Sequence, residues 1–568
     1  MSVLSHNMVI KAINDIASIC YLKGLRNVVL SPGSRCAPLT LAFNRHGDFN
    51  IYTIPDERAA AFIALGMAER TETPTILICT SGTAVLNYAP AVTEAYYRNI
   101  PLLVLTADRP PEWLEQWDGQ TINQKAIFEP HIKKSFSFPD SFEHKDALWF
   151  SHRLVNEAIN CSRSLGNGPV HINVPLREPF YPEKGEKLVF DKAIKLIDEP
   201  AFENSPGKDT LLRLSEELSQ YAKIVIVVGQ HKPDKSLIDA LSIVSLKLNI
   251  PVVADIIANL HGFAGTIRHS DAFLPKASAS LKPELLITLG QSVISKNLKL
   301  FLRQHQAIAH WHIAQADNVP DPMQSLTRIV RMSPPHFFKQ LLDTGVAPKS
   351  PEFMESWRSP DEKVKENFNS IFTHQPFNEF QAAYRFIKSI SGEAKLHLAN
   401  SMAVRYANFV GLSSQQNNIS VHANRGTSGI DGSTSTAVGI TLTCAVPNYL
   451  ITGDVSFFYD INAFWHNYLP ANFKILLLNN HGGGIFRLIP GPSQQPELEE
   501  LFETQQPRTA VRMAEEFGFS YFKSTGEEDF NSQLISFMED ENRAIFEVET
   551  NKENNQLFFN HFKSHINT

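Results

Sequence analysis

Short, nearly continuous runs of Val, Ile and Leu constrain this chain most strongly, because each run stops at small or polar residues and is followed by a helical stretch. Strands of this composition are buried on both faces, which is typical of parallel sheets covered by helices. The sequence therefore predicts an α/β fold of doubly wound parallel sheets. Ligands of such sheets bind beyond the carboxyl ends of the strands, so residues that end the runs are the first functional candidates. The runs lie at residues 27–33, 75–82, 101–108, 223–229, 284–290 and 474–480.

The chain is too long for a single hydrophobic core, because its 568 residues exceed the size at which one core stops growing. Two stretches rich in Pro and charge, residues 176–208 and 333–361, are typical of connections between domains. We therefore expect three domains, at residues 1–185, 200–340 and 360–568.

In the first and last thirds of the chain, small or polar residues end the apolar runs at corresponding positions. Gly82 and Thr106 end two apolar runs in the first third, and Gly453 and Asn479 end the corresponding runs in the last third at a nearly constant spacing. Small and polar residues follow strands in α/β proteins generally, which accounts for part of this agreement. Several matched strand ends nevertheless favour a real repeat. We expect two similar α/β domains separated by a third one.

Charge and cysteine usage narrow the class of protein. Lys and Arg number 52 against 59 Asp and Glu, and the net charge of −7 argues against a nucleic-acid or anionic-membrane binder, although not against small anionic substrates. The five cysteines form no C-x-x-C pair, which favours buried thiols in a reducing compartment over disulfides or zinc. The sequence shows no signal peptide and no apolar run of ~20 residues. We expect a cytoplasmic protein without stable membrane insertion and without a nucleic-acid partner.

The strongest chemical signal is a pair of short motifs in the last third. Thr452-Gly453-Asp454 ends one apolar run, and Asn479-Asn480-His481-Gly482 ends the next. A hard divalent cation prefers oxygen ligands, which the Asp454 carboxylate, the Asn480 amide and the carbonyl of Gly482 can supply. Each motif alone would be read as turn residues after a strand. Their pairing instead favours a metal site whose remaining positions take water and diphosphate oxygens.

This pair of motifs resembles the cofactor motif of the thiamine diphosphate enzymes. Within that family, three further segments resemble the 2-succinyl-5-enolpyruvyl-6-hydroxy-3-cyclohexene-1-carboxylate synthases of menaquinone biosynthesis: LSPGSRCAPLT at 30–40, TADRPPE at 106–112 and NRGTSGIDG at 424–432. Residues 400–405 and 482–486 fit as well. The resemblance spans the chain and is thin only in the middle third, where Ser295-Lys296 is nearly the sole anchor.

The resemblance implies a three-domain thiamine diphosphate enzyme. Its domains would be a pyrimidine-binding domain, a central domain without bound cofactor, and a diphosphate- and metal-binding domain. The cofactors would be thiamine diphosphate and Mg²⁺ or Mn²⁺. It further implies a homodimer or homotetramer with active sites at the subunit interface.

The implied activity is that of a transferase. It decarboxylates 2-oxoglutarate and adds the succinyl-semialdehyde unit to isochorismate. One alternative is another thiamine diphosphate-dependent 2-oxo acid decarboxylase or carboligase. Another is a non-catalytic nucleotide- or flavin-binding protein, which the absence of a G-x-G-x-x-G after a strand disfavours.

The resemblance also assigns site residues. Glu57 would exchange a proton with the aminopyrimidine ring, although an acidic residue there is also favoured by the dipole of a following helix. Ile430 would bend the cofactor, and Phe486 would pack beside the reacting centre, unless both simply fill the core. The cofactor-binding set is Glu57, Ile430, Gly453, Asp454, Asn480 and Gly482, and the metal ligands among them are Asp454, Asn480 and Gly482.

The two substrates together carry four carboxylates, so the site needs several cations, for which the planar fork of Arg is well suited. Two departures from the family are visible: Val455 stands where many thiamine enzymes have Gly, and Asn297 where some relatives have a second basic residue. Gln124 is an alternative to Gln120. By resemblance, the residues that bind 2-oxoglutarate are Ser401, Arg405 and Arg425, and those that face isochorismate are Ser34, Arg35, Arg109, Gln120 and Lys296.

Overall fold

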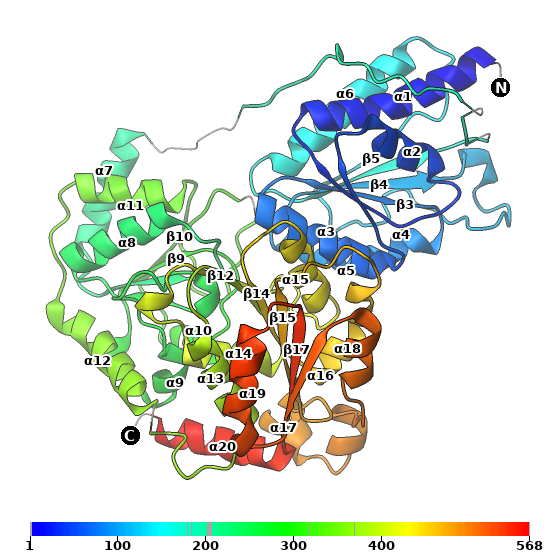
Figure 1. The fold of residues 1–568 in the computed structure, drawn as a ribbon. Helices are drawn as coiled ribbons and strands as arrows, with labels where there is room; N and C mark the ends of the chain where they lie inside the picture. Colours follow the sequence, from blue (N-terminus) through cyan, green and yellow to red (C-terminus); the bar gives the residue numbers. More distant parts are fainter. Residues whose placement is uncertain are drawn as a thin grey trace. The chain divides into compact units, whose positions relative to one another are not determined.

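The computed structural model describes residues 3–178, 180–182, 185–200, 207–316, 318–368 and 370–566. Strands and helices alternate along the chain (Figure 1). The strands form three wholly parallel sheets of six, five and six strands. The apolar runs of the sequence become strands that are almost entirely buried, such as β3 (Thr75–Cys79) and β7 (Ile224–Val228). The predicted fold class, doubly wound parallel sheets in three domains, is confirmed.

The chain forms two compact units, and the domain boundaries predicted from the sequence stay predictions. The predicted connection 176–208 falls partly outside the described residues. The other, 333–361, contains helix α11 (Pro334–Asp343) and the beginning of helix α12 (Pro351–Asn367), both anchored by buried aromatic side chains.

The first unit comprises Met1–Ala201, Asn424–Ala445 and Phe458–Ala471. Its six strands lie in the spatial order β2-β1-β3-β4-β6-β5. Helices α1, α2 and α6 lie on one face of this sheet, and α3 and α5 lie on the other (Figure 1). Apolar side chains of α1, α2 and α6 form a core with the strands. The strands are β1 (Asn27–Leu30), β2 (Asn50–Thr53), β3, β4 (Leu102–Asp108), β5 (Lys134–Ser137) and β6 (Pro169–Pro175); the helices are α1 (Val3–Leu22), α2 (Ala37–His46), α3 (Glu57–Thr71), α4 (Thr83–Asn87), α5 (Ala89–Tyr97) and α6 (Asp146–Arg163).

Helix α15 (Ser433–Leu442) also belongs to the first unit, although it follows the loop after β13 in the last third of the chain. It packs against α3 at a very short distance between backbones. A methyl group added to Gly66 of α3 would collide with the carbonyl oxygen of Thr436, and one added to Gly439 of α15 would collide with that of Ile63. Only glycine at both positions permits this contact.

The second unit comprises Phe202–Ala423, Val446–Phe457 and Asn472–Thr568, and holds two sheets. The five-stranded sheet has the order β11-β10-β9-β7-β8, with α7, α8 and α11 packed on one face and α9, α10 and α12 on the other. Its strands are β7, β8 (Val252–Ala254), β9 (Leu285–Leu289), β10 (Ala309–Ile313) and β11 (Arg328–Val330); its helices are α7 (Lys208–Ser219), α8 (Lys235–Leu248), α9 (Ser270–Phe273), α10 (Lys296–Gln304), α11 and α12.

The third sheet has the order β13-β12-β14-β15-β17-β16, which is the order of the first sheet strand for strand. This agreement supports the repeat read from the strand ends. The strands are β12 (Ala394–Leu398), β13 (Ile419–His422), β14 (Asn448–Gly453), β15 (Phe473–Asn479), β16 (Ser520–Ser524) and β17 (Ala544–Glu549); the helices are α13 (Glu379–Ser389), α14 (Met402–Val410), α16 (Asp454–Tyr459), α17 (Ile485–Leu488), α18 (Val511–Phe517), α19 (Glu527–Glu539) and α20 (Lys552–His565).

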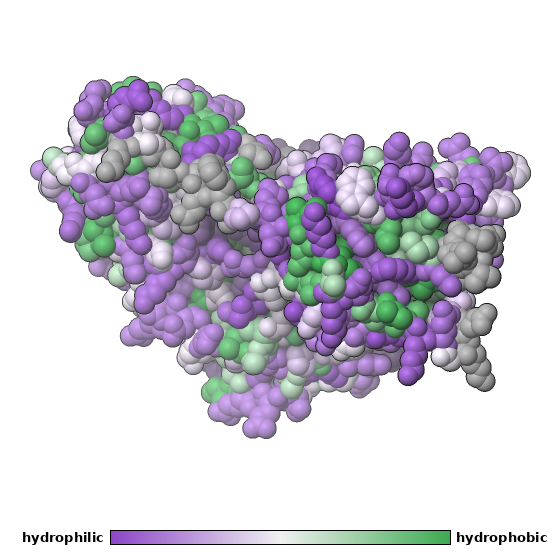
Figure 2. Space-filling model, turned by 90° about the horizontal axis from the view of Figure 1, so that it is seen from above, coloured by the Kyte–Doolittle hydropathy of each residue, from purple (hydrophilic) through white to green (hydrophobic). Residues whose placement is uncertain are grey.

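The hydrophilic surface and the free cysteines agree with what the charge and the cysteine usage of the sequence predict. The face shown in Figure 2 is largely hydrophilic, and hydrophobic side chains gather on it in small groups. Among the described residues, no helix has both the length and the apolar character that crossing a bilayer requires. All five cysteines are free, and Cys20, Cys36 and Cys79 are buried.

Candidate active site

Asp454 and Asn480 come to the same edge of the third sheet. Strands β14 and β15 are neighbours in register, with Gly453 opposite Leu478, and the two candidate ligands follow directly after these strands. The Asp454 carboxylate accepts the backbone N–H groups of Val455 and Gly482. The sheet therefore brings the predicted metal ligands of both motifs together.

Gln506 adds a contact to this cluster that the sequence did not reveal. Its Nε2 donates to Asp454 Oδ2 at 2.7 Å. Burial raises the pKa of Asp454 to about 6, although these hydrogen bonds and His481 favour the ionised form. A divalent cation bound there would lower that pKa, because it stabilises the charged carboxylate.

The amide of Asn480 has a defined orientation. Its Nδ2 donates to Oε1 of Glu379 at 2.7 Å, which leaves the amide oxygen as the end that can act as a ligand. Glu379 is buried and accepts a second hydrogen bond from the Tyr406 hydroxyl at 3.2 Å. Burial and the nearby charge of Asp454 raise the pKa of Glu379 to about 7.

This donor set fits a hard divalent cation. A carboxylate, an amide oxygen and the carbonyl of Gly482 are oxygen ligands of the kind that Mg²⁺ and Mn²⁺ accept. The described residues contain no cluster of three or more His, Cys, Asp or Glu that could hold a metal ion. A cation at Asp454 therefore depends on this mixed set together with water or ligand oxygens, as expected for a diphosphate-bound Mg²⁺.

A cavity of ≈730 Å³ lies beside Asn480, within the size range of small-molecule sites. All but one of its lining residues are polar, and they come from two segments of the second unit that follow strands β15 and β17. The lining residues are Asn480, His481, Gln505, Gln506, Pro507, Thr550, Asn551, Lys552 and Glu553.

The second unit also holds two of the predicted substrate cations. Arg405 donates from Nη1 to the carbonyl of Ser401, a residue with φ of 73° just before α14. Lys296 is the exposed first residue of α10. Asp271 links the two regions electrostatically: it favours the charged form of Arg405, and it accepts a 2.6 Å hydrogen bond from the hydroxyl of Ser295, next to Lys296.

Phe486 is the second residue of the short α17, which follows the glycine-rich segment after Asn480. Its ring is half-buried, and its centroid lies 6.0 Å from that of Phe502. The ring therefore packs on one side while part of it stays exposed, which suits a residue at the wall of a site.

In the first unit, Glu57 is the first residue of α3, and both of its neighbours in the chain are anchored. Asp56 caps the helix by accepting from the Ala59 N–H at 3.1 Å and also accepts from Asn462 at 2.6 Å. Arg58 donates to the Tyr459 carbonyl at 2.9 Å. Burial raises the pKa of the Glu57 carboxyl, as suits a group that exchanges a proton near neutral pH.

Arg35 is buried and held in place by the segment after β6. Its Nη1 donates to the Leu176 carbonyl at 2.8 Å, and its guanidinium lies over the Phe180 ring at 4.7 Å. Glu178 lies 4.0 Å from the same guanidinium. Ser34, next to it, is exposed.

Arg109 and Gln120 belong to one loop. Arg109 donates from Nη2 to the Gly119 carbonyl at 2.7 Å, and its Nε lies 2.8 Å from the Asp118 carboxylate. Gln120 is exposed and has φ of 53°. The loop therefore presents the guanidinium and this amide close together.

Gln124 has a different environment from Gln120. It is fully buried, its Oε1 accepts from the Gly82 N–H at 2.9 Å, and its Nε2 donates to Asn173 Oδ1 at 2.9 Å. Both ends of the Gln124 amide are thus used inside the protein. This favours Gln120 as the residue that faces a substrate.

Arg425 and Ile430 lie in one half-buried loop, residues 424–432, of the first unit. Glu94 of α5, which is buried, holds this loop. It accepts from the Gly426 N–H at 2.8 Å, the Thr427 N–H at 2.6 Å and the Thr427 hydroxyl at 2.7 Å. This contact was not foreseen, because nothing in the sequence relates α5 to a loop so far along the chain.

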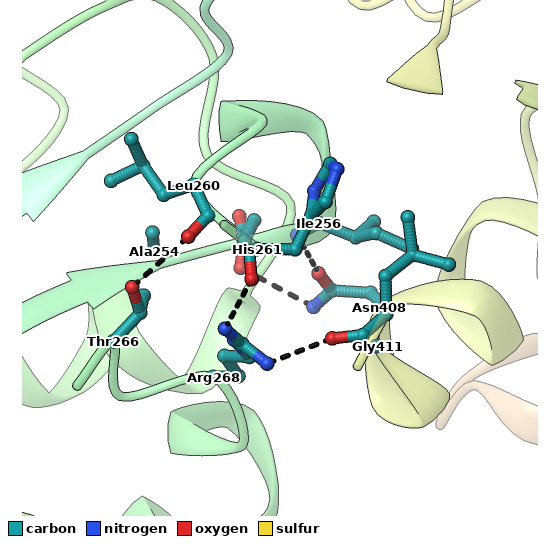
Figure 3. A pocket seen from close by; sticks show the side chains of 10 residues that line it. Ala254, Ile256, Leu260, His261, Thr266, Arg268, Asn408 and Gly411 are labelled. Atoms are coloured by element: carbon teal, nitrogen blue, oxygen red, sulfur yellow. Dashed lines mark hydrogen bonds between the residues drawn. The ribbon is translucent and has the colours of Figure 1, made fainter. Parts of the chain in front are cut away.

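A second, much smaller cavity lies between η2 (Ile256–Ala258) and α14 (Figure 3). Arg268 closes it by donating to the carbonyls of Leu412 and His261 at 2.7 and 3.0 Å, and Asn408 donates to Asp255 at 3.2 Å. Its volume of ≈10 Å³ suits about one water molecule. It is too small for a substrate.

Three family models match the chain in succession. They are the N-terminal TPP binding domain of thiamine pyrophosphate enzymes at residues 10–127, the middle domain of thiamine pyrophosphate at residues 212–398, and the C-terminal TPP binding domain at residues 401–548. The matches to the N- and C-terminal models cover Glu57 and the Asp454–Asn480 pair, respectively.

Curated relatives match over nearly the whole chain, and each is named 2-succinyl-5-enolpyruvyl-6-hydroxy-3-cyclohexene-1-carboxylate synthase. One from Cytophaga hutchinsonii is 44% identical over 563 residues, which cover 98% of this chain and 99% of the relative. One from Flavobacterium johnsoniae is 37% identical, covering 97% and 98%. One from Porphyromonas gingivalis is 36% identical, covering 95% and 94%.

Proposed function

This chain belongs to the 2-succinyl-5-enolpyruvyl-6-hydroxy-3-cyclohexene-1-carboxylate synthase family of thiamine pyrophosphate enzymes, and on that premise we propose that it catalyses the reaction of that name. It decarboxylates 2-oxoglutarate and transfers the succinyl-semialdehyde unit to isochorismate, releasing carbon dioxide in a step of menaquinone biosynthesis. The observation that carries the proposal is the 44% identity over nearly the full length.

Thiamine diphosphate is the cofactor of this family, and when bound it supplies a nucleophilic carbon and an electron sink. Asp454, Asn480 and Gly482 would hold the divalent cation, whose charge would neutralise the diphosphate. Gly453 is the last residue of β14 and directly precedes Asp454. The hydrogen bond from Gln506 keeps the Asp454 carboxylate oriented before the cation arrives.

Glu57 moves a proton at the aminopyrimidine ring. Its carboxyl suits this task because burial raises its pKa above the ordinary value, which favours the protonated form. The anchors on Asp56 and Arg58 fix the start of α3, and a hydrogen bond with Asn87 holds the carboxyl. Ile430 shapes the bound cofactor, and Phe486 excludes water beside the reacting centre.

The cationic residues bind the substrate carboxylates. Arg35, Arg109 and Arg405 each donate one guanidinium N–H to a backbone carbonyl. Such a contact fixes the plane of the guanidinium while leaving other N–H groups for a bidentate carboxylate. Ser401, Arg405 and Arg425 serve 2-oxoglutarate, and the residues that serve isochorismate are Ser34, Arg35, Arg109, Gln120 and Lys296.

We further propose a homodimer or homotetramer whose active sites lie at subunit interfaces. Glu57 belongs to the first unit and Asp454 to the second, and the reaction needs both at one cofactor molecule. The identical strand order of the first and third sheets supports this proposal, because similar domains can pair about a pseudo-twofold axis.

The proposed reaction is tested by a substrate-omission assay. Purified protein with thiamine diphosphate and Mg²⁺ is given 2-oxoglutarate with or without isochorismate, and carbon dioxide and the product mass are measured. We expect the adduct only when both substrates are present. Carbon dioxide release with no adduct to isochorismate would favour another decarboxylase or carboligase instead.

A further inference from the structure

Glu379 is a buried carboxyl group that the proposed reaction does not use. It is the first residue of α13, and its side chain accepts hydrogen bonds from two residues elsewhere in the second unit. Oε1 accepts from Asn480 Nδ2 at 2.7 Å, and Oε2 accepts from the Tyr406 hydroxyl at 3.2 Å. Tyr406 directly follows Arg405 in α14.

The contact with Asn480 has a consequence for metal binding. A side-chain amide has an oxygen that can bind a cation and an NH₂ group that cannot, and the two ends have nearly the same shape. Both carboxyl oxygens of Glu379 accept hydrogen bonds in the structure, one from Asn480 and one from Tyr406, so this group selects the NH₂ end of the amide. Partners that orient a metal ligand in this way commonly change metal affinity 10–100-fold when removed.

A second contact restricts the same end of the amide. A Cβ atom built on Gly484 would lie 2.6 Å from Asn480 Nδ2, so the backbone of the glycine-rich segment packs closely against the NH₂ group. Glu379 itself is anchored, because its backbone N–H donates to Asn555 Oδ1 at 3.0 Å. The NH₂ group is therefore held between a fixed carboxyl group and a fixed backbone.

We propose that Glu379 is a positioning residue that orients the Asn480 amide so that its oxygen, and not its NH₂ group, faces the divalent cation. This inference rests on the proposed metal site at Asp454, Asn480 and Gly482. Glu379 does not bind the cation in this account. It acts through Asn480, and Tyr406 braces the other carboxyl oxygen.

The test is the Mg²⁺ affinity of the Glu379→Gln variant, measured by calorimetry in the presence of thiamine diphosphate. The Gln side chain has almost the same shape but can donate as well as accept, so Asn480 is no longer held in one orientation. We expect the Mg²⁺ Kd to rise about 10–100-fold. Tyr406→Phe keeps the contact with Asn480, and we expect a smaller rise.

Asp361→Asn is the matched control. Asp361 is also a buried carboxyl of the second unit, and one of its oxygens accepts from the Arg268 and His269 N–H groups at 2.8 and 2.6 Å. Like Glu379→Gln, the variant Asp361→Asn replaces one carboxyl oxygen by an NH₂ group, but Asp361 does not contact the residues of the proposed metal site. We expect this variant to keep the wild-type Mg²⁺ affinity even if it melts at a lower temperature.

A swapped pair separates orientation from general damage. In the double variant N480D/E379Q the donor and acceptor are exchanged, so one hydrogen bond joins the two side chains again and an oxygen still faces the cation. We expect the double variant to bind Mg²⁺ more tightly than Glu379→Gln alone. If the single variant does not fold, the double variant is compared with the wild type, and recovery of a folded protein with Mg²⁺ affinity near that of the wild type supports the role of Glu379.

The outcomes separate this inference from the metal site on which it rests. If Asp454→Asn loses Mg²⁺ binding while Glu379→Gln equals the Asp361→Asn control, Glu379 has no positioning role and the metal site stands. If Asp454→Asn binds Mg²⁺ like the wild type, the proposed metal site itself is wrong. A double variant no better than the single one would also overturn the role of Glu379.

Discussion

Among single residues, Glu57 shows how the fold adjusts a common side chain to a particular task. An acidic residue in the first turn of a helix is stabilised by the helix dipole and is ordinary in that position. Here the carboxyl is half-buried, and burial raises its pKa while the N-cap at Asp56 fixes the helix start. The proposed role thus requires the same residue to satisfy the helix and to hold a proton that can be exchanged.

Glu57→Gln should bind thiamine diphosphate but exchange the C2 hydrogen of the bound cofactor ~10²–10⁴-fold more slowly, because an amide cannot pass a proton to the ring. NMR of the bound cofactor measures this rate. A raised pKa means that the carboxyl stays protonated above pH 4.5, so the wild-type profile should contain a step above that pH which the variant lacks. Glu157→Gln, on the surface of α6, is the control, and unchanged exchange in Glu57→Gln would contradict the role.

The substrate cations should separate by kinetics. Arg405→Ala should mainly impair the decarboxylation of 2-oxoglutarate, whereas Arg35→Ala and Lys296→Ala should mainly impair addition to isochorismate. Loss of one charge-assisted contact to a buried carboxylate costs about 2–5 kcal/mol, which is easily measured. Single-turnover measurements of each half-reaction test this division, and equal loss of both half-reactions in all three variants would contradict it.

At this scale, the sequence predicted residues that end strands and missed residues that act from elsewhere. Asp454 and Asn480 could be proposed from the sequence because apolar runs end at them. Glu379, Gln506 and Glu94 have no such marker, because each contacts a candidate residue or its loop only through tertiary contacts with segments far away in the chain. The choice between Gln120 and Gln124 likewise needed burial, which spacing alone does not give.

At the scale of elements, the strands were the easiest to predict. Runs such as β7 and β15 consist almost wholly of side chains that are stable only when buried on both faces. The helices α11 and α12 were missed because Pro334, Pro351 and Pro360 made their segment resemble a connection. Two of these prolines lie in first turns, where proline is tolerated.

The contact of α3 with α15 gives a prediction at this scale. Gly66→Ala or Gly439→Ala would force a methyl group into the facing backbone, at a cost of about 1–3 kcal/mol or more. We expect a lower melting temperature in thermal denaturation. Gly207→Ala, where an added methyl group meets nothing within 4 Å, is the control. If Gly66→Ala melts like that control, the two helices are not packed as closely as described.

At the scale of the whole molecule, the shared-site proposal predicts complementation. Glu57→Gln and Asp454→Ala should each be nearly inactive alone. After subunit exchange between them, a mixed dimer contains one site with both defects and one site with neither, so about one quarter of the wild-type activity should return. Mass spectrometry verifies the exchange. Activity that stays absent after verified exchange would mean that each chain builds its site alone.

The first unit combines segments that lie far apart in the chain, and this affects how the protein folds during its synthesis. Its sheet is complete by residue 175, but α15, which covers the glycine face of α3, lies at 433–442. A ribosome synthesises residues 202–423 in between, so α3 leaves the exit tunnel long before its partner exists. During that interval the face of α3 that α15 covers has no partner helix, and folding intermediates with exposed apolar surface tend to aggregate. Completion of the first unit therefore waits for the last third of translation.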